Sequence, residues 1–327
     1  MKKLLLASAV AALSITAAQA APQVYGKAFL TLDVQDGDEK SAYENTRTQL
    51  SSIGSRIGFK GSEALTANTD LVYQLEYGVD VDAGTGDQFR ARDTFLGLSN
   101  KQYGTLLAGR LTTIDGMVDY ATVAKGGVVG GDNVLATFDA PRANNAFAYV
   151  SPSYNGLNFL SMYALDENNA TDSLGRDAFG VGVQYEPENS AYRAGTTYIQ
   201  SGDTKAVRVS GAFDLSPATT VAALYQNTQW SAFHRPILET GAEKENAFTV
   251  SAEHKLAQTP WTTYGQLDYV DNKEGFKDSE AFRTVVGGKY AFNKATTGHV
   301  YGAYLKEEVS NESADSYGIG GGLEYKF

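Results

Sequence analysis

Short segments in which apolar residues alternate with polar residues or glycine recur along almost the whole chain, and this two-residue period is the strongest constraint on its fold. The C-terminal segment shows the pattern most clearly. One of its faces carries Tyr317, Ile319, Gly321, Leu323, Tyr325 and Phe327, and the other carries Gly318, Gly320, Gly322, Glu324 and Lys326. Each such segment has roughly ten residues, the length that a tilted strand needs to cross a bilayer.

The alternation predicts sixteen strands. They are expected near residues 24–34, 52–60, 69–80, 89–99, 104–111, 144–151, 157–166, 176–187, 190–200, 204–215, 218–229, 246–257, 261–270, 281–292, 296–308 and 316–327. No helical stretch competes with them, and no run of 18 apolar residues occurs outside the N-terminus, so a helical membrane protein is excluded. The pattern therefore predicts an all-β fold, in which residues 21–327 form a single transmembrane antiparallel β-barrel.

The connections between these strands are of two kinds. Four prolines fall in short connections, where a missing N–H costs the sheet no hydrogen bond: Pro152, Pro187, Pro217 and Pro260. Other connections are longer and charged, the clearest being residues 35–47, 166–175, 230–245 and 271–280. Short periplasmic turns and longer extracellular loops are typical of an outer-membrane barrel. A soluble β-sandwich would also alternate, but it would need an apolar core, whereas here glycine and charged residues dominate one face.

The composition excludes several kinds of chemistry. The 327 residues contain no Cys, which removes disulfides, thiolate metal ligands and Cys nucleophiles together. The three His have no metal-binding spacing, and no Gly-x-Ser-x-Gly run occurs, so we expect no metal site and no cofactor. The 27 basic and 38 acidic residues give a net charge of −11, which argues against nucleic acid binding.

The N-terminus has the pattern of an export signal. Two lysines precede an apolar stretch over residues 4–12, and a small-residue cleavage site ends at Ala20. We expect residues 1–20 to be removed by cleavage after Ala20. The alternative is a membrane anchor, but the apolar stretch is shorter than the ~20 residues that a span requires.

One connection, residues 111–143, exceeds the ~12 to 15 residues beyond which structureless loops are usually functional. Its glycine-rich middle, residues 126–131, permits tight folding. A barrel of ~16 strands encloses a lumen that side chains cannot fill, so a water-filled space must be narrowed by something else. We expect residues 111–143 to fold inward as a constriction loop, and an exposed surface loop is the alternative.

Five stretches occur in an order that is more specific than any one of them alone. They are residues 24–28, 55–61 and 92–110, the run Gly130, Gly131 and Asp132, and the final Phe327. In this order they resemble the family of Gram-negative outer-membrane general porins, which are non-specific diffusion channels. The resemblance covers essentially the whole chain after residue 20.

This resemblance implies a sixteen-stranded barrel, a homotrimer and passive diffusion of small hydrophilic solutes and ions. It places the chain in the outer membrane of a Gram-negative bacterium, in contact with outer-membrane lipid and lipopolysaccharide. It also implies that Phe327, with Tyr325 on the same face, forms a C-terminal assembly signal. A channel of this kind is not an enzyme.

Parity along the second strand selects two basic residues for the channel interior. Ile53, Ile57 and Phe59 share one face, which we take as the outward one. Arg56 and Lys60 then point into the lumen. A charged side chain near the midplane of the lipid face costs ~2 to 4 kcal/mol, which also favours the lumen for clustered arginines.

Four further basic residues are candidates for the constriction. On the fourth strand an outward Phe95 directs Arg92 inward. Arg110 shares the parity of apolar neighbours, so its inward orientation rests on its charge and on the resemblance. Arg142 closes the long connection, and Lys125 lies within it. A position of these arginines at a rim is the alternative.

The opposing acids should lie on the long connection, and the candidates are Asp115, Asp119, Asp132 and Asp139. Asp132 matches the family best. The usual acidic pair ahead of it is absent, because Lys-Gly-Gly-Val-Val stands at residues 125–129. These charges suggest a constriction more basic than the acidic exterior, since rings of fixed charge set selectivity. The ion preference itself stays open.

Three other functions are weighed against a general channel. A substrate-specific channel would line its path with aromatic residues, but Tyr alternates onto the outward face wherever parity can be tested. A barrel enzyme would need a His near a rim, for which His234 is the candidate. An adhesin is the third.

Overall fold

The structure is a computed structural model that describes residues 21–82, 88–131, 133–165, 178–231, 244–310 and 312–327. The expected export signal and His234 lie outside these residues. The strands are β1 (Gln23–Gly37), β2 (Arg47–Ser52), β3 (Arg56–Ala64), β4 (Thr69–Val79), β5 (Phe89–Asn100), β6 (Gly104–Thr112), β7 (Arg142–Val150), β8 (Leu157–Ala164), β9 (Ala178–Tyr185), β10 (Tyr192–Ser201), β11 (Thr204–Ser216), β12 (Thr219–Gln229), β13 (Lys244–Lys255), β14 (Trp261–Asp271), β15 (Ser279–Ala291), β16 (Thr296–Val309) and β17 (Glu312–Lys326). Three short 3₁₀ helices are η1 (Ile114–Val118), η2 (Val128–Gly130) and η3 (Lys273–Gly275).

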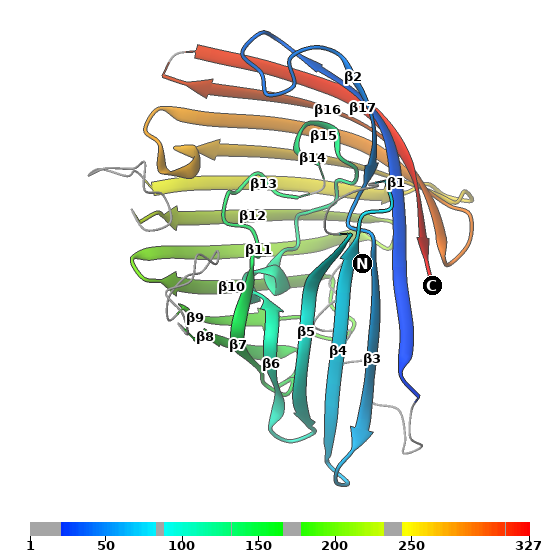
Figure 1. The fold of residues 1–327 in the computed structure, drawn as a ribbon, viewed down its shortest axis with the longest axis vertical. Helices are drawn as coiled ribbons and strands as arrows, with labels where there is room; N and C mark the ends of the chain where they lie inside the picture. The colour runs from blue at the N-terminus through cyan, green and yellow to red at the C-terminus, as the bar shows by residue number, and fades with distance from the viewer. Residues whose placement is uncertain (1–20, 83–87, 132, 166–177, 232–243, 311) are drawn as a thin grey trace.

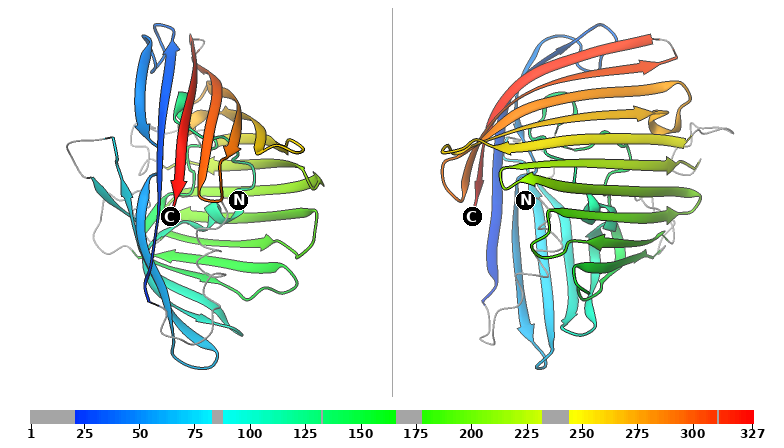
Figure 2. Two further views of the ribbon diagram at one scale, coloured as in Figure 1. Left: turned by 90° about the vertical axis from the view of Figure 1, so that its right-hand side faces the viewer. Right: turned by 180° about the vertical axis from the view of Figure 1, so that it is seen from behind.

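The strands form one closed antiparallel sheet. Each strand from β3 to β17 pairs with the next one along the chain, and β17 returns to pair with β1. β1 pairs with β3 at its start and with β2 further on, so β2 and β3 share a single position in the wall. The predicted barrel of sixteen strands is therefore confirmed. Because barrel strands are tilted, the steep strands β3–β6 cross β10–β15 of the other wall in Figure 1 and Figure 2.

The wall position shared by β2 and β3 is interrupted at residues 53–55. Gly54 has φ +58° there, a left-handed conformation that glycine adopts at little cost. The Ser55 hydroxyl accepts a hydrogen bond from the Phe29 N–H at 2.9 Å and so replaces a rung of the ladder. The break also turns Ile53, whose Cδ1 lies beside Gly127 in the barrel interior. The expectation that Ile53 shares the outward face is wrong for this reason.

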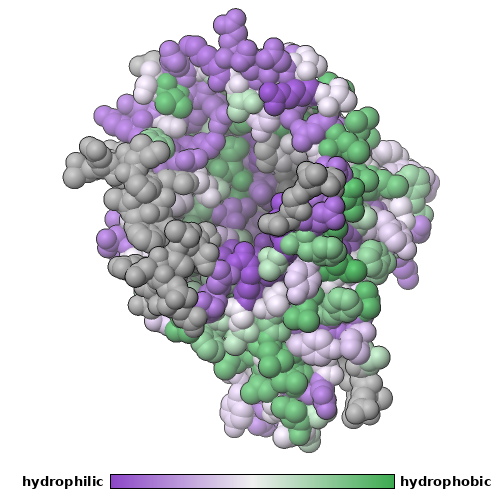
Figure 3. Space-filling model, in the orientation of Figure 1, coloured by the Kyte–Doolittle hydropathy of each residue, from purple (hydrophilic) through white to green (hydrophobic). Residues whose placement is uncertain are grey.

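On strands such as β4 and β17 the two faces of the wall alternate as predicted. On β4 the side chain of Leu75 is exposed on the outside, whereas Gln74 and Glu76 are buried within. On β17 the outward Ile319 alternates with glycines on the inner face. Hydrophobic residues accordingly cover much of the visible outer wall, and hydrophilic residues gather toward the top of the view in Figure 3. Such a surface matches a hydrocarbon environment around the barrel.

The two rims have different connections. At one rim, called here the short-turn rim, connections such as residues 65–68, 101–103 and 292–295 join the strands, and the barrel closes at Phe327. At the opposite, long-loop rim, β6 and β7 are joined by residues 113–141, although β10 and β11 are joined by a tight turn at 202–203. Within the described ranges no helix has the length and apolar character to cross a membrane.

Aromatic side chains cluster at the short-turn rim. The rings of Tyr290 and Phe292 lie 4.8 Å apart, and those of Tyr325 and Phe327 lie 6.0 Å apart. Phe327 also closes the seam between the first and last strands, because its N–H donates to the Gly26 carbonyl and its carbonyl accepts from the Gly26 N–H. The last residue of the chain is thus part of the closed ladder.

Deletion of Phe327 should reduce the yield of folded barrel, because it removes both hydrogen bonds to Gly26 and the ring packed on that residue. Phe327→Ala keeps the backbone bonds and should cause a smaller loss. Refolding yield, measured by heat-modifiable gel mobility, checks both expectations. Phe292→Ala removes a rim aromatic away from the seam and serves as the control. Normal assembly of the truncated chain would contradict a role for Phe327 in closing the barrel.

Candidate channel constriction

Residues 113–141, which join β6 to β7, run inside the barrel, and we call them the inner loop. η1 near the start of this loop packs against β8–β11, and η2 near its middle packs against β1, β16 and β17. The loop therefore passes from the β6–β7 hairpin across the interior to the seam where the barrel closes, as Figure 1 shows. Many of its side chains are buried against the wall.

Arg208 on β11 is the main polar anchor of the inner loop, and it is 1% exposed. Its Nη2 donates to Asp139 Oδ1 at 2.8 Å and lies 3.6 Å from Asp115 Oδ2. Its Nε donates to Gln226 Oε1 at 2.7 Å, and the Gln226 amide donates to the Phe138 carbonyl. One guanidinium thus holds both the outgoing and the returning limb of the loop.

Other wall side chains satisfy the backbone of the middle of the loop. On β14, Gln266 Oε1 accepts hydrogen bonds from the N–H groups of Val123 and Ala124 at 3.0 and 3.1 Å. On β13, Glu245 accepts the Thr137 N–H at 2.9 Å. Buried backbone donors need such partners, so these side chains remove the main cost of placing a loop inside the barrel.

The tip of the inner loop lies on a row of small residues. A Cβ at Gly318 of β17 would lie 2.6 Å from Val128 Cγ1, so the tip can approach the wall there because this residue is glycine. Gln35 of β1 accepts the Val129 N–H at 3.3 Å. Gly126 has φ +103° and packs against a tyrosine ring of β16. Gly318 of the last strand therefore makes room for the tip of the loop.

Apolar contacts complete the attachment. Ile114, Val118, Tyr120 and Phe138 of the loop join Leu107 and other wall residues in one buried cluster. Burying an Ile, Val or Phe side chain contributes ~1.5 to 3 kcal/mol each. The loop and the wall from β6 to β11 thus form a packed half of the barrel interior. The basic cluster described next lies on strands β3–β5 and β7.

Glu76 on β4 joins two of the predicted arginines. Its Oε1 accepts a hydrogen bond from Arg92 Nε at 2.6 Å, and its Oε2 lies 3.6 Å from Arg56 Nε. Tyr25 donates its hydroxyl to the same Oε2 at 3.0 Å. Glu76 is 0% exposed, but the side chains of Arg56 and Arg92 are 17% and 21% exposed. The carboxylate therefore fixes two guanidiniums that still reach the open interior.

Arg92 faces this interior for a reason that simple alternation missed. The pairing of β4 with β5 shifts by one residue, so Arg92 and Asp93 both stand opposite Glu76. Phe95, expected to face outward, is 5% exposed inside the barrel, and Leu96 faces outward instead. The predicted outward direction of Phe95 was therefore wrong. Arg92 points inward as predicted, but the cause is the bulge rather than regular alternation.

Asp93 joins the third arginine to this group. Its Oδ1 accepts from Arg142 Nε at 3.0 Å and from the Thr112 N–H and hydroxyl at 2.9 and 2.7 Å. The wall therefore carries three arginines and two carboxylates, Glu76 and Asp93. The sequence analysis did not identify either carboxylate, although Glu76 shares the inward parity of Gln74 on β4.

The predicted lysines have separate environments. Lys60 lies on β3 four residues after Arg56, and its Nζ is 5.1 Å from the centre of the Tyr25 ring. Lys27, which was not predicted, stands opposite Arg56 on β1 and lies 3.8 Å from Glu324. Lys125 is buried in the inner loop. The partly exposed arginines of the interior thus lie on β3, β5 and β7.

Arg110 does not belong to this group. Leu107 on the same strand is 1% exposed in the interior, and Leu106, which has the parity of Arg110, is 47% exposed on the outside. Arg110 donates to the Ala91 carbonyl and to Asn144 Oδ1 on the neighbouring strands. The expectation that Arg110 points inward is wrong, because strand parity determines its direction and charge does not.

Three of the acidic candidates on the inner loop, Asp115, Asp119 and Asp139, lie within the described residues, and each has a partner away from the arginines of β3, β5 and β7. Asp115 and Asp139 face the wall and pair with Arg208. Burial raises the pKa of Asp139 to about 6, and the charge of Arg208 opposes this rise. Asp119 accepts two N–H groups of the loop itself. Asp132 lies outside the described residues.

Comparison with known proteins supplies the family. The family model for Gram-negative porins matches residues 6–326. The chain belongs to this family. The major outer membrane protein P.IB of Neisseria sicca is 26% identical over 367 aligned positions that cover the whole of both chains.

Solved porins have the same fold. An anion-selective porin from Comamonas acidovorans superposes with a TM-score of 0.75 at 20% identity, covering 94% of this chain and 99% of that one. OmpF of Salmonella typhi, in complex with daunomycin, gives a TM-score of 0.68 at 17% identity, with 94% and 97% covered. This porin is accordingly an outer-membrane channel for passive diffusion of small hydrophilic solutes, and not an enzyme.

Arg208→Met should destabilise this porin by about 3 to 5 kcal/mol, because it leaves the buried carboxylates of Asp115 and Asp139 unpaired. Replacing both aspartates by Asn in the same chain should recover part of the loss. Urea unfolding in lipid vesicles gives the free energies. Arg193→Gln breaks the rim pair with Asp214, which is about a third exposed, and should cost at most about 1 kcal/mol. Equal effects of the two arginine substitutions would contradict the anchoring role.

Proposed function

We propose that the inner loop and the arginine-bearing wall form the constriction of this porin, and that the constriction prefers small anions over cations. The observation that carries the proposal is the grouping of Arg56, Arg92 and Arg142 on one side of the lumen. Glu76 pairs with Arg56 and Arg92, and Asp93 pairs with Arg142. Three guanidiniums and two carboxylates of the wall therefore stand where a solute passes, which favours an anion.

The orientation of these guanidiniums supports the proposal. Both Arg56 and Arg92 approach Glu76 through Nε, and in the described part of the chain their Nη groups bond no protein atom. A guanidinium held in this way presents its remaining N–H groups to a passing oxyanion. Because the site is partly shielded from bulk water, its charge acts on an ion more strongly than a surface charge does.

Two acids of the inner loop face away from these arginines. Asp115 and Asp139 are paired with Arg208, on the side of the loop that packs against the wall. Lys60 extends the positive surface along β3, whereas Lys27 on β1 pairs with Glu324. The Comamonas porin that shares this fold is described as anion-selective, which favours the same preference here.

Neutralising the arginines tests the preference. Arg56→Gln, Arg92→Gln and Arg142→Gln should each shift the zero-current potential across a salt gradient toward cations, because each removes a fixed charge from the narrowest region. Planar-bilayer recording of the purified porin gives this potential. Folding of each variant is checked by heat-modifiable gel mobility.

Arg90→Gln is the matched control, because Arg90 pairs with Asp80 near the long-loop rim and its side chain is 64% exposed. Its charge should be screened within about 8 Å at physiological ionic strength and should leave the potential nearly unchanged. If all three interior variants kept the selectivity of the parent porin, the constriction assignment would be refuted. The channel itself would still stand.

The same proposal includes an export signal at residues 1–20, removed after Ala20, and assembly of the barrel as a homotrimer. The trimer is supported by the outward Arg110. It lies six residues into β6 from Gly104, about 20 Å along the strand, near the middle of the apolar band. There an Arg facing lipid costs ~2 to 4 kcal/mol. A second barrel against this wall would remove that cost.

A free strand edge on the same side supports association as well. β2 pairs with β1 along one edge, and within the described residues its other edge has no strand partner. Unpaired edges are the usual sites of strand addition between chains. Among the solved porins of this fold, OmpT of Vibrio cholerae is described in a trimer form.

Arg110→Leu distinguishes an interface from a lipid-facing wall. If a second copy covers this wall, the substitution should weaken the oligomer, because it removes a polar contact between subunits. If lipid covers it, the barrel should become more stable and its oligomeric state should not change. Light scattering of the detergent-purified porin, before and after mild heating, measures the outcome. Phe248→Leu, on the far wall, is the control.

A further inference from the structure

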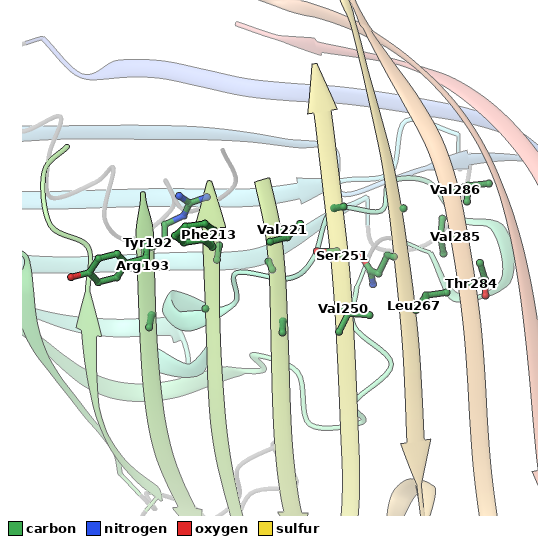
Figure 4. Close-up of a pocket in the computed structure, with 18 residues that line it drawn as sticks. Tyr192, Arg193, Phe213, Val221, Val250, Ser251, Leu267, Thr284, Val285 and Val286 are labelled. Atoms are coloured by element: carbon green, nitrogen blue, oxygen red, sulfur yellow. The ribbon is translucent and has the colours of Figure 1, made fainter. Parts of the chain in front are cut away.

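A hollow of about 840 Å³ opens along β10–β15, on a wall of the barrel that carries none of Arg56, Arg92 and Arg142 (Figure 4). Its exposed side chains are apolar and face outward, including Phe213, Val250, Leu267 and Val286. The hollow has the volume of a typical small-molecule pocket, which is ~300 to 1,000 Å³. It interrupts an outer wall that is otherwise studded with large side chains.

Small residues on adjacent strands form the floor of this hollow. Ala194, Gly211 and Ala223 stand side by side across β10, β11 and β12. Ala252 and Gly265 stand side by side across β13 and β14, two residues nearer to the strand ends. The floor of the groove is therefore continuous, and it shifts by two residues along the strands between β12 and β13.

Larger side chains border the groove on both sides. Phe213 and Val221 flank it where the floor is formed by β11 and β12, and Val250 and Leu267 flank it where the floor is formed by β13 and β14. Val286 closes its end on β15. The result is a trough that is narrow in one direction and open along the other.

The groove lies in the half of the barrel nearer the short-turn rim. Ala223 is four residues from the start of β12, and Ala252 is three residues from the end of β13, and both strand ends lie at that rim. Tyr192, at the β10 end of the groove, packs against Tyr185 with ring centroids 5.9 Å apart. Tyrosine pairs of this kind mark the membrane–water interface, so the groove begins there and extends into the apolar band.

We infer that this groove binds one hydrocarbon chain of a phospholipid of the periplasmic leaflet. The rim with short turns is the periplasmic one in outer-membrane barrels, so the lipid that reaches the groove belongs to that leaflet. Association within a bilayer depends on van der Waals packing rather than on water release. A chain lying in the groove contacts its floor and both borders, whereas a chain on a flat wall contacts one surface.

A hydrocarbon chain fits this groove better than a second copy of the porin does. The outer wall of another barrel is convex and bears protruding side chains, whereas the groove is concave and narrow. The outward Arg110, which calls for a protein neighbour, lies on β6 and not on β10–β15. The inference depends on the membrane location of the barrel and is independent of the proposed anion preference.

Photo-crosslinking in vesicles tests the inference. The full porin is reconstituted with a phosphatidylethanolamine that carries a diazirine in the middle of one acyl chain, and labelled peptides are identified by mass spectrometry. Labelling should be several-fold higher at Val250 and Leu267 than at Val300, an outward residue of β16 beyond the groove.

Filling the groove provides the decisive comparison. Gly265→Leu and Ala223→Leu place side chains on the floor, and a Cβ at Gly265 would have no atom closer than 3.9 Å. Each should reduce labelling at Val250 and Leu267 several-fold without changing channel conductance. Gly302→Leu is the matched control, because Gly302 lies one strand beyond the groove and a Cβ there would have no atom closer than 3.6 Å.

Three results would overturn the inference. The first is equal labelling over the outer wall, and the second is unchanged labelling in both groove-filled variants. The third is crosslinking of Val250 or Leu267 to a second porin chain, which would assign the groove to a protein interface. Loss of conductance in the groove-filled variants together with Gly302→Leu would indicate misfolding, and milder Gly265→Ala and Ala223→Val would then replace them.

Discussion

The structure depends on holding a loop of polar backbone inside a barrel that is too wide to be filled by its own side chains. Arg208 meets this constraint by binding both limbs of the inner loop, through Asp115 and Asp139. An ion pair that is fully buried contributes little net stability, because desolvation offsets the attraction. Its value lies in geometry, since any displaced position of the loop leaves a buried charge without a partner.

The arginines of the interior thereby divide into two groups. Arg208 and Arg283 are buried on the far wall, where they pair with carboxylates and hold loop backbone. The arginines of β3, β5 and β7 keep part of their surface open and pair with Glu76 and Asp93. The pairing of Asp115 and Asp139 with the far wall and the partial exposure of Arg56, Arg92 and Arg142 are therefore two results of one arrangement.

The alternation predicted the strand positions and the direction of Arg56, because a regular strand preserves parity over its whole length. The same rule failed around Phe95 and at Ile53, since a bulge or a glycine turn shifts parity without a clear local signal. The roles of Asp115 and Asp139 could not be predicted either. Their partner Arg208 is far away in sequence, and only the closed barrel brings these residues together.

Glycine and alanine serve opposite faces of this barrel in different ways. On the inner face of β17, Gly318 makes room for the tip of the inner loop, so the absence of a side chain fixes a protein segment in place. On the outer face, Gly265 and its neighbours leave a trough that no protein segment in the described residues enters. On the inner face a small residue thus allows close approach by a protein segment, whereas on the outer face adjoining small residues leave room for a lipid chain. The sequence predicts through strand parity whether a small residue faces the inside or the outside of the barrel. Only the register between strands shows whether several small residues lie side by side and form a continuous surface.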